Sequence, residues 1–375
     1  MKGHIKERSP GHYAIVLDVR DPQTGKRKRK WHSFAGTKRE AQVERARLIA
    51  EIASGGYVEP SKQTFEQYFT DWLRDWAPVK AGPKACEAYG YWGKHLIAAI
   101  GAKPIQQVRG GDLNRAYREA ASRGLGDWSV KHLHILARRV FGHALKQGDI
   151  KRDPSGDVDA PSVAPKEAAV LRAEEIPVLL RALQGSDLYP IIVTALGTGM
   201  RRGELCALRW QDVDLDGGKL EVRQSLEQTR KAGLRFKQPK SKHGRRSITL
   251  PTSTITCLRE HLVHQLEQRM QLGLGKPAPD ALVFCNLDGQ PLRPDALTDR
   301  FARAMVSAAL PHVGLHTLRH THASMLIRAG EDIVTVSRRL GHASPSITLD
   351  VYSHLISSKD TAAAAIEPAL REGLG

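Results

Sequence analysis

The sequence predicts a multidomain, mainly α-helical protein that also contains small antiparallel β-sheets. Its 375 residues are enough for two or three domains. Strand-like alternation of apolar and polar residues occurs mainly near the N-terminus and around residues 219–250, whereas apolar residues at helical spacing dominate elsewhere. Residues 151–169 are rich in Pro, Asp and Ala and have no periodicity, which is typical of a linker between domains.

The charge balance indicates a polyanionic partner. The chain has 57 Lys and Arg against 40 Asp and Glu, a formal net charge of +17, which favours nucleic acid over a basic protein without such a partner. The cysteines are scattered and form no C-x-x-C pair, so we expect neither a zinc site nor a disulfide framework. They are Cys86, Cys206, Cys257 and Cys285.

The distribution of apolar residues indicates a protein of the cytosol. No run of about 18 apolar residues occurs, so we expect no membrane span. The opening residues, MKGHIKERSPG, also lack an apolar run, so we expect no signal peptide. Together with the basic charge, these observations predict a cytoplasmic protein that binds nucleic acid.

Residues 1–58 predict a basic module of two or three strands and one helix. HYAIVLDVR alternates as a strand does, DPQTG reads as a turn, and KRKRKWHSF reads as the returning strand. Thr37 can cap a helix that runs to Ala53. An unbroken basic run on the returning strand could lie in a groove of DNA, with a solvated charge run as the alternative. This run is Lys26, Arg27, Lys28, Arg29 and Lys30.

Residues 61–150 predict a helical module. We interpret the aromatic stripe of TFEQYFTDWLRDWAP as core rather than as a base-stacking surface. The stripe consists of Phe65, Tyr68, Phe69, Trp72 and Trp76. Further helices are expected over 85–100, 111–122 and 128–147, and the last carries basic residues that could face a phosphate backbone, with a solvated face as the alternative. These basic residues are Lys131, Arg138, Arg139 and Lys146.

Residues 170–357 supply side chains suited to breaking a phosphodiester. A tyrosine hydroxyl has a pKa near 10, so it attacks only if its proton is removed or its anion is stabilised. Two guanidiniums can hold the charge that gathers on the phosphate, and a lysine among other cations can protonate the leaving oxygen. The residues of these types are Arg201 in TGMRRGE, Lys240 on a predicted hairpin, His316 and Arg319 in H-x-x-R, His342 in L-G-H, and Tyr352.

The sequence patterns around these residues predict the helices and strands on which they lie. His316 and Arg319 are three residues apart and share one helix face. A second helix is expected over 332–340, and Tyr352 falls on a last short helix that begins near Pro345. KLEVRQ, LRFKQ and RSITLP read as three strands of one small antiparallel sheet, with Lys240 in the turn that joins the last two.

These motifs, in this order and spacing, resemble those of the tyrosine recombinases, also called phage-type integrases. H-x-x-R-H, L-G-H and the following Tyr resemble the family's C-terminal motifs, and TGMRRGELCALRW resembles its first motif. The resemblance covers nearly the whole chain, and it implies a nucleoid-associated protein of a bacterial host. It implies an α+β catalytic domain over 170–357, a helical, SAM-like core-binding domain over 61–150, and an N-terminal domain of three strands and one helix over 1–58 that binds arm-type DNA sites. It also implies that the tail, 358–375, contacts a neighbouring protomer.

The resemblance further implies a role for each candidate residue. Arg201 and Arg319 would clamp the scissile phosphate, with Glu204 orienting the first of them. His316 and His342 would assist, and Tyr352 would form a 3′-phosphotyrosine link. Lys240 would protonate the departing 5′ oxygen; Lys242 in the same KSK sequence is the alternative.

The remaining histidines and the cofactor requirement follow from the residue pattern. We interpret His320 and His322 as structural or DNA-facing. The histidines form no metal-ligand pattern such as H-E-x-x-H, so we expect no metal, and the scheme requires no cofactor.

The predicted function is therefore that of an integrase acting at the attachment sites of a phage or mobile element. The expected partners are double-stranded DNA and three further copies of the chain in a tetramer, with an excisionase or a DNA-bending protein as additional candidates. Two alternatives remain at this point: a type IB topoisomerase-like enzyme, and a DNA-binding regulator without catalysis. Whether Tyr352 acts in cis or in trans is also open.

Overall fold

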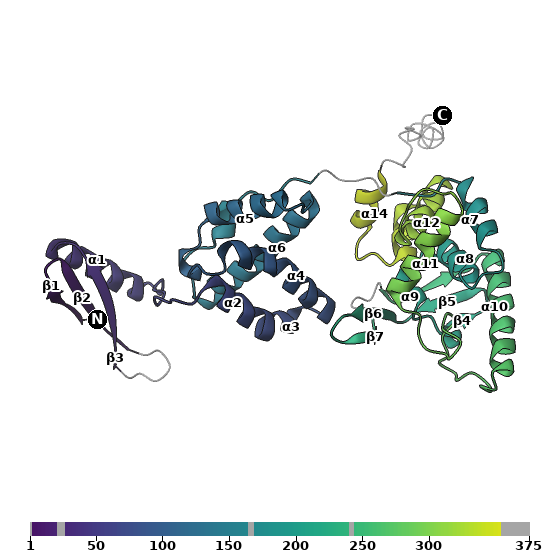
Figure 1. Ribbon diagram of the computed structural model, residues 1–375, viewed down its shortest axis with the longest axis horizontal. Coiled ribbons are helices and arrows are strands. Elements are labelled where there is room, and N and C mark those ends of the chain that lie inside the picture. Colours follow the sequence, from purple (N-terminus) through teal and green to yellow (C-terminus); the bar gives the residue numbers. More distant parts are fainter. Residues whose placement is uncertain (1, 21–26, 164–168, 240–243, 354–375) are drawn as a thin grey trace, which may run out of the picture. The chain divides into compact units, whose positions relative to one another are not determined.

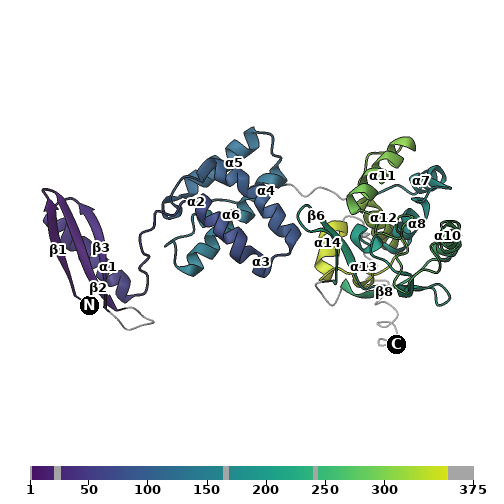
Figure 2. The ribbon, with the colours of Figure 1, turned by 60° about the horizontal axis from the view of Figure 1, so that its bottom comes forward.

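The computed structural model describes residues 2–20, 27–163, 169–239 and 244–353. The chain divides into an N-terminal unit, Met1–Ala164, and a C-terminal unit, Pro165–Gly375. The boundary falls inside the expected linker. Figures 1 and 2 show the elements of each unit, which are described separately below. The predicted fold class, mainly helical with small antiparallel sheets, is confirmed.

The N-terminal unit begins with a three-stranded antiparallel sheet that is covered on one face by a helix (Figure 1). The strands are β1 (Lys2–Ser9), β2 (His12–Arg20) and β3 (Arg27–Ala35), and the helix is α1 (Lys38–Ala53). Thr37 caps α1 in a capping box with Glu40, as its position before the helix predicted. Alternation places Ile15 and Leu17 against Leu48 of α1, so the opposite face of the sheet remains free of the helix.

The helical part of the N-terminal unit follows the predicted spacing closely. It comprises α2 (Phe65–Asp71), the π-helical turn η1 (Trp72–Trp76), α3 (Ala77–Lys80), α4 (Pro83–Ile100), the 3₁₀ turn η2 (Ile105–Gln107), α5 (Gly110–Ser122), α6 (Asp127–Gln147) and the 3₁₀ turn η3 (Pro154–Asp157). Four residues of the aromatic stripe are buried in its core, as predicted: Phe65, Tyr68, Phe69 and Trp72.

The fifth residue of that stripe corrects the prediction. Trp76 is 49% exposed and packs against the ring of His143 at 4.8 Å between centroids. The π-helical turn that ends at Trp76 adds a residue to one turn of the helix, which rotates the following side chain off the buried face. A stripe extrapolated at 3.6 residues per turn therefore fails at this position.

The C-terminal unit is mainly helical and also contains two small antiparallel sheets (Figures 1 and 2). Its helices are α7 (Glu175–Leu183), α8 (Tyr189–Thr198), α9 (Arg202–Leu205), the 3₁₀ turn η4 (Trp210–Asp212), α10 (Thr252–Gln271), α11 (Pro294–Ser307), α12 (His316–Arg328), α13 (Ile333–Leu340) and α14 (Pro345–Tyr352). Its strands are β4 (Val213–Asp214), β5 (Lys219–Val222), β6 (Ser225–Thr229), β7 (Gly233–Lys237) and β8 (Arg246–Thr249).

The strand pairing corrects the prediction of a single sheet. β5 pairs with β4 and β8, whereas β7, which contains the predicted strand LRFK, forms a separate hairpin with β6. The five residues of β7 are largely exposed, so they lack the buried face that would join them to the β4–β5–β8 sheet. The predicted strands on either side, β5 and β8, do pair with each other.

The core of the C-terminal unit fixes the elements that carry the candidate residues. α12 packs on α8 and α13, and α13 packs on α14. The ring of Tyr352, the last residue of α14, is buried in a small apolar cluster of α12 and α13 side chains. This cluster consists of Ala323, Ile327, Val336, Leu340 and Tyr352. In the parts of the chain that are described, no helix has the length and apolar character needed to cross a bilayer.

Candidate active site

Two helix ends meet at the centre of the candidate site. Gly199 directly follows α8 and Gly341 directly follows α13, and both C-cap glycines adopt left-handed backbone angles, with φ of +66° and +69°. The last carbonyls of a helix have no partner within the helix, and the negative end of the helix dipole lies there. At both ends these carbonyls accept hydrogen bonds from arginines distant in sequence.

Arg319 bridges the two helix ends. Its Nη1 donates to Gly199 O at 2.8 Å and its Nη2 donates to Leu340 O at 2.7 Å. The side chain is buried, and burial followed by the charge of Arg201 lowers the pKa of Arg319 to about 9, so it remains charged at pH 7. A buried guanidinium held by neutral carbonyls keeps its full positive charge available for an anion.

Arg201 lies at the junction between the turn and α9, as predicted. Its Nη2 donates to Gly341 O at 3.1 Å, and its Nη1 donates to Glu204 Oε1 at 2.9 Å. The same carboxylate accepts from the backbone N–H of Arg201 at 2.9 Å. Because its side chain is 40% exposed, Arg201 combines a fixed position with access from solvent.

Arg246 is a further member of the cluster that the sequence analysis missed. Its Nη2 donates to Glu204 Oε2 at 2.8 Å and its Nε donates to Arg339 O at 2.6 Å. Burial alone would raise the pKa of the Glu204 carboxyl, but Arg246, and then Arg201, bring it below the ordinary value. The signal was present in the alternation of β8, where Arg246 lies on the same face as the buried Ile248.

Tyr352 reaches the cluster through its hydroxyl. The residue is 2% exposed, and its Oη lies 2.6 Å from Nδ1 of His320. Burial raises the pKa of Tyr352 to about 12, and the positive charge of Arg319 acts in the opposite direction. The interpretation of His320 as structural or DNA-facing overlooked this contact. Its position four residues after His316 on one helix, directly beside Arg319, was the available signal.

The two predicted catalytic histidines, His316 and His342, differ in burial. His316 begins α12 and is exposed; its ring stands perpendicular to that of His320 at 4.8 Å. His342 follows α13, is half-buried, and bonds through Nδ1 to Thr348 Oγ1 at 2.8 Å. Burial, and then the charges of Arg319 and Arg201, lower the pKa of His342 to about 4, so its ring is neutral at pH 7.

His322 has a structural role, one of the two predicted for it. Arg339 Nε donates to its Nε2 at 3.0 Å, so its Nδ1 carries the proton and donates to Leu196 O at 2.6 Å. Arg339 Nη2 in turn donates to Gly197 O at 2.9 Å. These bonds satisfy further carbonyls at the end of α8 and fix the turn that leads to Arg201.

Several candidate residues lie outside the described residues. Lys240 and its alternative Lys242 are among them, as are Lys26 of the basic run, His354 and the tail. Their predicted roles remain predictions.

The DNA-binding candidates of the N-terminal sheet divide between its two faces. Arg29 and Trp31 lie on the face opposite α1, where Trp31 is 54% exposed and Arg29 Nε lies 3.4 Å from Asp18 Oδ1. Lys28 and Lys30 alternate to the side of α1, and Lys30 Nζ contacts the ring of Tyr57 at 4.4 Å from its centroid. The predicted basic run therefore presents only part of its charge to a single groove.

The candidates on α6 lie near aromatic rings. Lys131 Nζ lies 5.2 Å from the centroid of Trp128, and the guanidinium of Arg139 lies 5.6 Å from that of Tyr89. Arg138 is exposed and lies seven residues after Lys131, on the same face of the helix. Lys131 is half-buried and Arg139 is exposed.

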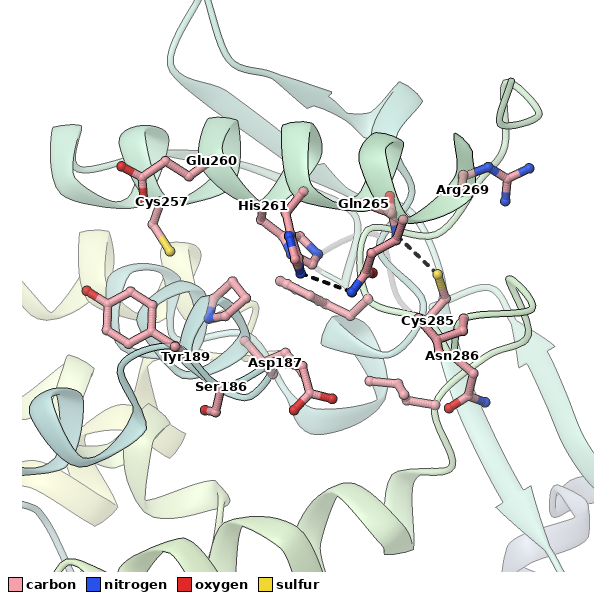
Figure 3. A pocket seen from close by; sticks show the side chains of 18 of the residues that line it. Ser186, Asp187, Tyr189, Cys257, Glu260, His261, Gln265, Arg269, Cys285 and Asn286 are labelled. Carbon is pink, nitrogen blue, oxygen red and sulfur yellow. Dashed lines mark hydrogen bonds between the residues drawn. The ribbon is translucent and has the colours of Figure 1, made fainter. Parts of the chain in front are cut away.

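A pocket of about 460 Å³ opens elsewhere in the C-terminal unit, between α10, the start of α8 and residues 284–292 (Figure 3). None of its lining residues is a predicted catalytic residue. Burial raises the pKa of its Cys257 thiol to about 11 and also raises that of Cys285, which accepts from Gln265 Nε2 at 3.1 Å. The thiols therefore stay protonated and are poor nucleophiles. Within the described residues, no group of three or more His, Cys, Asp or Glu is arranged to hold a metal.

Comparisons with known proteins identify the family and the fold of the chain. The model of the phage integrase family matches residues 169–359. The chain is 26% identical over 368 residues to a XerC-like tyrosine recombinase of Caldanaerobacter subterraneus subsp. tengcongensis, covering 93% of this chain and 94% of that protein. It is also 26% identical over 359 residues to the ICEBs1 integrase of Bacillus subtilis, covering 95% and 96%.

Solved structures share the fold. An integrase of the transposon Tn1549, in complex with transposon right end DNA, matches with a TM-score of 0.68 and 23% identity, over 81% of this chain and 99% of that one. A λ integrase tetramer bound to a Holliday junction matches with a TM-score of 0.57 and 20% identity, over 91% and 96%.

Proposed function

The chain belongs to the phage integrase family of tyrosine-type site-specific recombinases, and we propose from this premise that Tyr352 is its nucleophile. The observation that carries the proposal is the position of the Tyr352 hydroxyl. It lies at the end of a buried ring, bonded to a histidine that directly follows Arg319. A phenol in this setting is fixed in position and lies within the electrostatic influence of a buried cation.

Arg201 and Arg319 form the phosphate clamp in this proposal. Backbone carbonyls and Glu204 hold both guanidiniums before DNA arrives, so little reorganisation is required when the phosphate binds. Their remaining N–H groups donate to the non-bridging oxygens as charge develops there. His342, neutral at pH 7, and the exposed His316 add hydrogen bonds to the same phosphate.

The reaction is a balanced exchange of one phosphodiester for another. The Tyr352 oxygen bonds to phosphorus, the bond to the 5′ oxygen breaks, and Lys240 protonates that oxygen. The product is a 3′-phosphotyrosine link and a free 5′-hydroxyl. A 5′-hydroxyl of a partner strand then reverses the step. Because the covalent link conserves the bond energy, no ATP is consumed.

The burial of Tyr352 within its own unit supports delivery in cis. Its ring packs against α12 and α13 of the same chain, and α12 also carries Arg319. Nucleophile and clamp thus belong to one protomer in this proposal.

The partners follow from the charge of the other elements. We propose that the chain acts on double-stranded DNA at the attachment sites of a mobile element, as a tetramer. Residues 61–150 would bind the core site, and the free face of the β1–β3 sheet would bind arm-type sites. An excisionase or a DNA-bending protein would set direction, and the tail 358–375 would contact a neighbouring protomer.

A nicked suicide substrate tests the function. When the short strand next to the cleavage site diffuses away, the covalent complex is trapped and migrates slowly on a denaturing gel. Wild type should be trapped, and Tyr352→Phe should bind the same DNA without being trapped. The absence of any trapped wild-type complex on its attachment site would refute the proposal. Joining of strands between two duplexes then distinguishes a recombinase from a topoisomerase-like enzyme, which rejoins only its own strand.

A further inference from the structure

We propose that His320 is the general base that removes the proton of Tyr352 during DNA cleavage. This inference rests on the proposed role of Tyr352 as nucleophile. It begins from the distance of 2.6 Å between Tyr352 Oη and His320 Nδ1, which is short for a hydrogen bond between neutral groups. His320 thereby touches a reacting atom.

The burial of Tyr352 makes a protein base necessary. The ring is 2% exposed, so bulk water has little access to the hydroxyl. Phenols are poor nucleophiles while they retain the proton, and the apolar cluster around the ring offers no acceptor. The proton therefore has to leave through the polar end of the side chain, where His320 lies.

The other histidines are less well placed for this task. His342 Nδ1 is already bonded to Thr348 Oγ1 at 2.8 Å. His316 is exposed and meets His320 by a perpendicular ring contact at 4.8 Å. Among the described residues, His320 is the one whose side chain forms a hydrogen bond with the Tyr352 hydroxyl.

The surroundings keep His320 in the form that accepts a proton. Burial, and then Arg319, lower the pKa of His320, so the ring is neutral at pH 7. The titratable and charged groups around it are His316 and Arg319 on α12, His342 after α13, and Tyr352 on α14. A neutral ring with its proton on Nε2 leaves the Nδ1 lone pair directed at the tyrosine hydroxyl.

The proton balance of the step is complete. As Tyr352 Oη bonds to phosphorus, its O–H bond breaks and the proton passes to His320 Nδ1. The bond from phosphorus to the 5′ oxygen breaks, and that oxygen takes a proton from Lys240. In strand joining the incoming 5′-hydroxyl gives its proton to the lysine, and His320 returns its proton to the departing tyrosine oxygen.

His320→Asn is the informative variant, because the asparagine amide can occupy the position of Nδ1 but does not accept a proton at neutral pH. In single-turnover cleavage of the nicked substrate, we expect His320→Asn and His320→Ala both to be about 10²-fold to 10⁴-fold slower than wild type. DNA affinity and thermal unfolding should be unchanged for His320→Asn. His312→Asn, a histidine replacement in the exposed loop before α12, is the matched control and should cleave at the wild-type rate.

The pH profile separates a base from a positioning residue. The wild-type rate should rise with pH in the acid range and level off at a pH below the ordinary histidine value of about 6.5, because the pKa of His320 is lowered. For His320→Asn the rate should keep rising above neutral pH, because the free tyrosinate then becomes the reactive species. A fluorinated tyrosine at position 352 ionises more readily and should restore much of the lost rate in His320→Asn.

Two results would overturn the inference while leaving the proposed function intact. One is a trapped wild-type complex together with His320→Asn cleavage within about threefold of wild type. The other is a slow His320→Ala beside a normal His320→Asn, which would show that a hydrogen bond suffices. If His320→Asn does not fold, a wild-type rate that shows no rise with pH anywhere in the acid range where the protein stays folded has the same force. Failure of the wild type to form any covalent complex would instead count against Tyr352 as nucleophile.

Discussion

Two regions of this molecule are rich in arginine, and they use it in opposite ways. On the free face of the N-terminal sheet, Arg27 and Arg29 are exposed and share a single carboxylate, Asp18. In the C-terminal unit, the side chains of Arg319 and Arg246 are buried. Main-chain carbonyls hold Arg319, whereas the Glu204 carboxylate and Arg339 O hold Arg246. The first arrangement gives adaptable charge, and the second gives charge at fixed positions.

The difference indicates two kinds of contribution to DNA recombination. Exposed cations bind DNA by releasing counterions from its phosphates, a contribution that depends on salt and tolerates small displacements. Buried cations act on one phosphate, where a displacement of about 1 Å can cost a large part of the rate. Substitutions in the sheet should therefore change affinity, whereas substitutions at the helix ends should change rate and stability.

The largest effect should come from Arg319→Lys. Lysine keeps the charge but cannot bridge Gly199 O and Leu340 O while still donating to a phosphate, so single-turnover cleavage should fall about 10²-fold to 10³-fold. Arg328→Lys makes the same change at the exposed end of the same helix and should cleave within about twofold of wild type. Equal cleavage rates for Arg319→Lys and Arg328→Lys would contradict the claim that the fixed position of Arg319 matters for catalysis.

Acid should weaken the C-terminal unit through its buried histidines. The pKa of His322 is lowered to about 4, by burial and then by Arg339, from an ordinary 6.5, so the unfolded chain binds more protons between these values. Stability is therefore highest above pH 6.5 and is lost as pH falls toward 4, by on the order of 2–3 kcal/mol for this residue.

Hydrogen exchange can locate this loss. Protection factors of α8 and α12, measured at pH 7 and pH 4.5, should fall in wild type. They should change less in His322→Gln, whose side chain does not titrate. Equal losses in both proteins would assign the acid sensitivity to other groups.

The smallest effect should come from Arg29→Ala on the sheet. Loss of one exposed cation should weaken binding to arm-type DNA and reduce the slope of log affinity against log salt by about 1. Cleavage of a nicked substrate that contains only the core site should be unaffected. Arg39→Ala, an equal change of charge on α1 at the opposite side of the sheet, is the matched control. An identical salt slope in the two variants would argue against the free face as the DNA-binding surface.

The sequence allowed prediction of the elements better than of the contacts between them. The helix with His316 and Arg319, the turn before Arg201 and the terminal helix with Tyr352 follow from caps, glycines and periodicity. These are local signals, and each acts within one or two turns of the chain. The same reasoning failed at Trp76, because a π-helical turn changes the period without a mark in the sequence.

The missed residues needed information about distant parts of the chain. Arg246 is buried because it meets Glu204, 42 residues away, and His320 becomes part of the site because Tyr352, 32 residues later, folds back onto it. Neither residue stands out among the many Arg and His of a basic chain. In the same way, nothing local separates β7 from the β4–β5–β8 sheet, since the strand resembles its neighbours in composition.

The use of main-chain oxygens to hold the guanidiniums affects how the site can evolve. Any amino acid brings the same carbonyl, so substitutions along the last turns of α8 and α13 cannot delete the acceptors that Arg319 uses. Substitutions should be harmful mainly at Gly199 and Gly341, because a residue with a side chain is strained in their left-handed backbone conformation. At Gly199 the added Cβ would also lie 2.7 Å from His322 Cδ2. The sequence of these two helix ends can therefore vary widely in evolution while the backbone acceptors of Arg319 are retained.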